Sequence, residues 1–135
     1  MDPNPHPPAA ARERLAAQLP RLRRVARALA CDPQRSDALV AATVARALAG
    51  SGHEASLSML AGCWRERGRL DGPAPGDEVD AAMSALPAEQ RAAVALVLVA
   101  GLRHAEAAEM LDVPVDTLAE RLVRGREALA GALVA

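Results

Sequence analysis

Apolar residues recur every three or four positions along most of the chain, which is the spacing of one face of an α-helix. In the N-terminal half this spacing predicts three helices, at residues 9–29, 36–49 and 55–70. The first segment contains Pro20, so we expect either a kink or a break into two helices at that residue. Ser36 has a side chain suited to capping the start of the second helix.

The C-terminal half has the same apolar spacing, and it predicts four further helices. We expect them at residues 77–85, 88–100, 104–111 and 115–133. Pro87 suits the first position of the second of these, because its ring fixes a helical φ where no N–H is needed. Gly101 should end that helix. The tripeptide Asp112-Val113-Pro114 should turn the chain between the last two.

Composition agrees with a chain made of helices alone. Ala, Leu, Val and Arg dominate, Lys, Phe and Tyr are absent, and Trp64 is the one aromatic residue. Residues that favour strands are therefore scarce, and the prediction is an all-α fold with an aliphatic core to which Trp64 contributes. The Gly- and Pro-rich stretch D-G-P-A-P-G divides the chain into two small domains. We predict a disordered lead at 1–8, a first domain at 9–70, a linker at 71–76 and a second domain at 77–135.

Charge is distributed unevenly between the two halves. Residues 1–70 carry 11 Arg and 6 acidic residues, whereas residues 71–135 carry 5 Arg and 11 acidic residues. The basic half suits contact with nucleic acid or with an acidic protein. The acidic half is less suited to binding DNA.

Several function classes receive no support from the sequence. Cys31 and Cys63 are too few for a disulfide scaffold and indicate buried thiols in a reducing cytoplasm. The chain has no apolar run that would serve as a signal peptide or membrane span, so we expect a cytoplasmic protein with no membrane partner. His6, His53 and His104 are scattered, without the spacing of a metal site. We therefore expect no enzyme activity and no cofactor.

The stretch from 86 to 129 carries the clearest functional pattern. A short Ala-rich helix, a three-residue turn and a longer helix bearing Arg are the parts of a helix-turn-helix. Ala105 and Ala108 are small where two crossing helices must approach, and Val113 and Leu118 can fill the angle between them. A small antiparallel helical bundle would have the same pattern, so the residues alone leave both interpretations open.

Three consecutive segments of this stretch resemble region 4 of extracytoplasmic-function sigma factors of the sigma-70 family. They read L-P-A-E-Q-R-A-A-V-A-L-V-L-V-A-G-L, A-E-A-A-E-M-L and V-P-V-D-T-L-A-E-R-L-V-R-G-R-E-A-L. The resemblance implies that the last helix reads promoter DNA. It assigns DNA contacts to Thr117, Arg121 and Arg124 on that helix, with Arg103 and His104 at the start of the short helix.

The N-terminal half is similar to region 2 of the same family, through L-P-R-L-R-R-V-A-R-A-L (19–29) and S-D-A-L-V-A-A-T-V-A-R-A-L (36–48). In the family this region docks on core RNA polymerase and melts promoter DNA. The resemblance therefore implies a surface that binds polymerase or another protein. Its candidate residues are Arg21, Arg23, Arg24, Arg27, Asp37 and Val40.

The departures from the family pattern leave two hypotheses about function. The helix at 115–130 carries three Arg and three acidic residues, and Asp116, Ala119 and Glu120 replace the family's Gly, basic residue and Ser. The D-A-x-V-x-A-T pattern from Asp37 to Thr43 is similar to the sigma-like domain of general stress response regulators, which binds an anti-sigma factor. The chain is thus either a sigma factor that binds core RNA polymerase and promoter DNA, or a sigma-like module that binds an anti-sigma factor.

Overall fold

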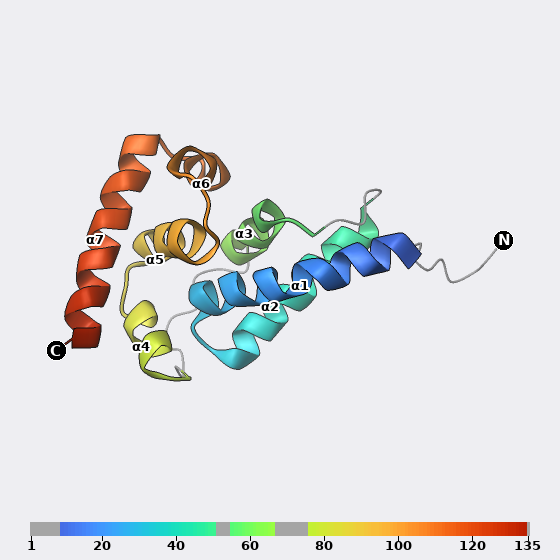
Figure 1. Cartoon of the computed structure of the whole chain (residues 1–135), viewed down its shortest axis with the longest axis horizontal. Helices are drawn as coiled ribbons and strands as arrows, with labels where there is room; N and C mark the ends of the chain where they lie inside the picture. The colour runs from blue at the N-terminus through green and yellow to red at the C-terminus, as the bar shows by residue number, and fades with distance from the viewer. Residues whose placement is uncertain (1–8, 51–54, 67–75, 135) are drawn as a thin grey trace.

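The computed structural model describes residues 9–50, 55–66 and 76–134, and these residues form helices joined by short turns, with no strand among them (Figure 1). The predicted all-α fold is confirmed. The helices are α1 Ala9–Ala30, α2 Pro33–Ala49, α3 Leu57–Glu66, α4 Glu78–Ser84, α5 Ala88–Val94, the π-helix η1 Ala95–Val99, α6 His104–Leu111 and α7 Val115–Val134. The predicted lead at 1–8 and most of the predicted linker at 71–76 lie outside the described residues.

Helix α1 runs through Pro20 without a break. Pro20 lies on the exposed side of the helix, where water can satisfy the backbone carbonyl that proline leaves without a donor. Its opposite side buries Leu15, Leu22, Val25 and Leu29. Cys31 ends the helix with a left-handed backbone, at a φ of 61°.

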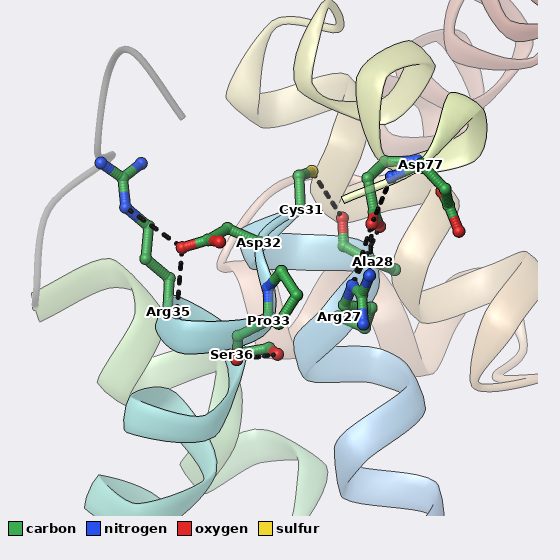
Figure 2. Close-up of polar contacts among 9 residues, drawn as sticks. Arg27, Ala28, Cys31, Asp32, Pro33, Arg35, Ser36 and Asp77 are labelled. Carbon is green, nitrogen blue, oxygen red and sulfur yellow. Dashed lines mark hydrogen bonds and ion pairs between the residues drawn. The ribbon is translucent and has the colours of Figure 1, made fainter. Parts of the chain in front are cut away.

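The predicted N-cap of α2 is wrong. Asp32 caps the helix by accepting a hydrogen bond from the Arg35 N–H, and Pro33 takes the first helical position. Aspartate followed by proline is a stronger start signal than a serine three residues later. Ser36 lies inside the helix, where its hydroxyl donates to the Pro33 carbonyl oxygen. Figure 2 shows this turn between α1 and α2.

Helix α3 completes the N-terminal half. It packs against α1 and α2 and buries Leu57, Leu60 and Trp64, so the predicted core position of Trp64 is confirmed. Its described part ends at Glu66, and the predicted extension to Leu70 falls outside the described residues. Cys31 and Cys63 are both buried and free, as predicted.

The C-terminal half follows the predicted order of helices with two corrections. Pro87 occupies the N-cap position of α5 rather than its first turn. The apolar segment predicted as one α-helix changes after Val94 into a π-helix, in which the Ala100 N–H donates to Ala95. Gly101 ends this segment at a φ of 78°, as expected of a glycine at such a position.

The two halves pack against each other. Helix α1 contacts α4, α5 and η1, and α3 contacts α6. Buried residues from both halves form one continuous core. In Figure 1, α4 and α5 lie between the long helix α7 and the pair formed by α1 and α2. The C-terminal end of α1 therefore meets the C-terminal half, and surfaces shared by both halves become candidates for function.

Candidate functional site

Helices α6 and α7 form the predicted helix-turn-helix. Asp112 adopts a left-handed backbone after α6, and the Val113 N–H donates to the Ala108 carbonyl oxygen at 3.0 Å, which closes the turn. Leu118 is fully buried under the angle between the helices. The small residues at the crossing are Ala107 and Ala108. Ala105 faces solvent, so its predicted packing role is wrong.

The structure brings three of the predicted DNA-binding residues together on α7. Thr117, Arg121 and Arg124 line a polar hollow of about 350 Å³ with Glu120 and the start of α5. Arg124 forms an ion pair with Glu120, with 2.7 Å between Nη2 and Oε1. A carboxylate therefore lies among the arginines and opposes their attraction for phosphate.

Arg121 also lies close to the N-terminal half. It is half-buried and lines a second, smaller hollow together with Trp64 and Arg65 of α3. The Arg65 guanidinium donates to the Met110 carbonyl oxygen of α6 at 3.3 Å. In this closed arrangement, the side of the helix-turn-helix that carries Arg121 faces α3.

Arg103 and His104 lie at the start of α6 and do not line the hollow on α7. The Arg103 side chain and backbone N–H both donate to Oε1 of Glu106, at 3.0 and 3.2 Å. The side-chain hydrogen bond from Arg103, followed by the backbone one, lowers the pKa of Glu106 below its ordinary value. Arg103 is thus held by a carboxylate of its own helix.

The predicted partner-binding residues of the N-terminal half fall into separate places. Arg23, Arg24 and Arg27 lie together along α1 and face the C-terminal half. Arg21 instead donates to the Ala100 carbonyl oxygen at 2.8 Å. On α2, Asp37 is exposed, whereas Val40 is buried in the core. The predicted role of Val40 in a partner contact does not fit its burial in this arrangement.

The three arginines border an apolar groove of about 610 Å³ between the two halves, which we call the interdomain groove. Helix α1 contributes Ala28 and the arginines. The other apolar lining residues come from α4, α5, η1 and α7: Val79, Met83, Val94, Leu98, Val99, Leu129 and Leu133. Val79, Leu98, Val99 and Leu133 are exposed to solvent. An apolar surface contributed by five elements and bordered by charge is typical of a protein-binding site.

The π-helix shapes one wall of the groove. Within the π-helix Leu96 is buried, whereas Leu98 and Val99 are 50% and 39% exposed. Single π-turns inside helices occur often at functional sites. Sequence reasoning missed these residues and did not distinguish Leu133 from the rest of the predicted helix at 115–133. The sequence signal for these exposed residues is the apolar run from Val94 to Val99. Six consecutive apolar residues are more than one buried face of a helix can accommodate.

Beside the groove, Arg27 forms an ion pair with Asp80 of α4. Its Nε donates to the two carboxylate oxygens at 3.1 and 3.0 Å. The hydrogen bond to Asp80 raises the pKa of Arg27 above its already high value, so this guanidinium stays charged. Figure 2 shows Arg27 pointing toward the start of α4 beside Asp77. This predicted partner-binding residue therefore has a partner within the chain.

Two negative findings concern the described residues only. Between residues 9 and 134, outside the gaps at 51–54 and 67–75, no three acidic, histidine or cysteine side chains gather as they would around a metal ion. Over the same described positions, no helix combines the length and apolar character needed to cross a membrane.

Family models match one segment in each half of the chain. Residues 76–129 match the family Sigma-70, region 4, and residues 15–56 match the Sigma2 domain of PhyR. The fold is similar to that in the co-crystal structure of the sigma factor RpoE in complex with the anti-sigma factor NepR from Bartonella quintana. The TM-score is 0.71 at 23% sequence identity, over 90% of this chain and 95% of that chain.

Proposed function

We propose that this chain, a divergent sigma-like protein with a Sigma2 domain of the PhyR type and a sigma-70 region 4, acts by binding an anti-sigma factor in its interdomain groove. The observation that carries the proposal is the groove itself, where helices of the C-terminal half leave apolar side chains exposed beside Arg23 and Arg24 of α1. An apolar groove of this kind suits one face of an amphipathic helix.

Charge further specifies the partner. Arg23 and Arg24 are exposed at the border of the groove, and Arg27 is neutralised by Asp80. A helix that fills the groove should therefore carry acidic residues beside its apolar face. The solved relative supports this class of partner, because its structure was determined as a complex of a sigma factor with the anti-sigma factor NepR.

Promoter binding is the second candidate. The intact geometry of α6 and α7 favours it, since Thr117, Arg121 and Arg124 lie together on one side of the longer helix. The ion pair between Arg124 and Glu120 works against it. With acids and arginines equal in number on this helix, little net positive charge remains to attract the DNA backbone.

The test is a direct comparison of three purified ligands. The full chain is titrated with NepR from Bartonella quintana and its counterparts from the source genome, with core RNA polymerase, and with promoter DNA. We expect saturable one-to-one binding of a NepR-type protein, and DNA binding that is weak and close to nonspecific. Binding of polymerase and promoter DNA without any NepR-type protein would reverse the order of the two candidates.

A further inference from the structure

Four arginines make hydrogen bonds across the boundary between the two halves. Arg21 donates to the Ala100 carbonyl oxygen, Arg65 to that of Met110, and Arg91 to that of Leu29. These three bonds end on backbone oxygens. In the contact between Arg27 and Asp80, by contrast, both charges come from side chains.

The Asp80 carboxylate is deeply set in this contact, with the residue only 5% exposed. It also caps its own helix, because Oδ2 accepts the Asp77 N–H at 3.2 Å while the Asp80 N–H donates to Asp77 Oδ1 at 2.8 Å. Removing Arg27 would leave a buried carboxylate without its counter-charge, which is strongly unfavourable. The ion pair is therefore coupled to the start of α4.

Gly76 covers this ion pair with its backbone. A Cβ at this residue would lie 2.5 Å from both Arg27 Nη2 and Asp80 Oδ2. Since both atoms belong to the same ion pair, at least one of them must move to make room for a side chain at this position. Gly76, directly before the N-cap of α4, therefore fits the closed ion pair. Substituting Gly76 is a second way to disturb the ion pair, and it removes no charge.

The same pair lies in the wall of the interdomain groove. Arg27 comes from α1 next to Ala28, and Asp80 comes from α4 next to Val79, all four of which line the groove. We propose that Arg27 and Asp80 are positioning residues that hold α1 against α4, so that the groove exists before a partner arrives. The identity of the partner rests on the proposed function, whereas the contact between α1 and α4 does not depend on it.

Closure without a partner is measured in the full chain by electron paramagnetic resonance distance spectroscopy, with spin labels at Ala45→Cys on α2 and Glu127→Cys on α7. Both positions are exposed, whereas the native cysteines are buried. Three variants are compared. Asp80→Asn removes the charge but keeps an oxygen for the cap, and Gly76→Ala adds a methyl group against the ion pair. Arg14→Gln is the control, because it removes a charge from an exposed position of α1 that does not line the groove.

We expect one narrow distance distribution for the parent and for Arg14→Gln, and an added longer-distance population for Asp80→Asn and Gly76→Ala. Saturating NepR-type protein should return both variants to the narrow distribution, with a dissociation constant at least fivefold higher than that of the parent. A merely structural role would not give this recovery. If Asp80→Asn fails to fold by circular dichroism, Gly76→Ala decides the question.

The outcomes separate the two proposals. Unchanged distance distributions in folded Asp80→Asn or Gly76→Ala would overturn the positioning role, because the apolar interface alone would then hold the halves together. Longer distances in these variants with no binding of a NepR-type protein to the parent would support the positioning role. The same result would overturn the proposed function.

Discussion

The interdomain groove and the outer side of α7, which exposes Glu120, Val123 and Arg124, differ in the apolar surface and free charge that they offer a partner. In the groove, Leu98 and its neighbours expose apolar surface, and Arg23 and Arg24 at its border add positive charge. On α7, Arg124 already has a carboxylate partner in Glu120. Burial of apolar surface stabilises a complex, whereas an ion pair on one helix must be broken before it can bind phosphate. The groove is therefore the surface with more free energy to gain from binding.

Leu98→Asp should produce the largest effect, which is on partner binding in the groove. A carboxylate in the middle of the groove would be desolvated by a bound helix and would repel its acidic residues. We expect NepR-type binding to weaken by about 100-fold, or about 2.7 kcal/mol, measured by isothermal titration calorimetry.

Val123→Asp is the matched control, because Val123 is 53% exposed on α7 and Leu98 is 50% exposed. Both substitutions replace an exposed apolar residue, so both variants should remain folded. The control should bind like the parent. Equal weakening by the two substitutions would show that the partner does not distinguish the groove from the outer side of α7.

Gly125→Ala should have the next largest effect, because both surfaces depend on where α7 packs. A Cβ at Gly125 would lie 2.8 Å from Val94 Cγ2 and 3.3 Å from the Gln90 carbonyl oxygen. Overpacking of this kind should cost about 2 kcal/mol of unfolding free energy, measured by urea denaturation. It should also weaken groove binding, since Val94 lines the groove.

Gly131→Ala provides the control in the same helix. Nothing lies within 4 Å of a Cβ there, so the substitution should stabilise the protein by up to about 1 kcal/mol through helix propensity alone. If Gly125→Ala were equally stabilising, the close approach of α5 and α7 would not constrain the packing.

The limits of α6 and α2 show where helix boundaries can be predicted from the sequence. The bounds of α6 were predicted to the residue, because a short apolar repeat between Gly101 and Asp112-Val113-Pro114 has strong signals at both ends. The N-cap of α2 was misplaced at Ser36 because two good capping residues lie close together. Local patterns decide helix limits where the start signal is unique.

The groove could not be predicted in the same way. Leu133 continues the apolar spacing of α7, but it is half-exposed and lines the groove. Arg27 belongs to an Arg-rich stripe like its neighbours, and only the position of α4 gives it a partner 53 residues away. Contacts between distant segments decide which apolar and charged residues remain available, and periodicity contains no information about them.

Neutralising the acidic residues of α7 should produce a smaller effect, and it tests whether they limit DNA binding. The double variant Asp116→Asn with Glu120→Gln frees Arg124 and gives α7 a net positive charge. We expect DNA affinity at low salt to rise about tenfold, with a steeper dependence on salt concentration, measured by fluorescence anisotropy on a duplex.

The control for that variant removes two negative charges elsewhere. Glu13→Gln with Asp37→Asn makes the same change in net charge on exposed positions of α1 and α2. It should raise DNA affinity much less. A rise as large as that of the α7 variant would mean that overall charge, rather than the acids near Arg121 and Arg124, limits DNA binding.

The smallest effect should come from Glu106, whose hydrogen bonds from Arg103 lower its pKa in the folded protein. A carboxylate with a lowered folded-state pKa stabilises the protein above its unfolded-state pKa, and this contribution is lost as the pH falls through the folded-state value. The parent should therefore melt slightly above Glu106→Gln at neutral pH, and the difference should vanish in acid. A difference that persists at low pH would mean that the shape of residue 106, and not its charge, stabilises the start of α6. Arg103 would then be only weakly held by Glu106 and more readily available to a phosphate.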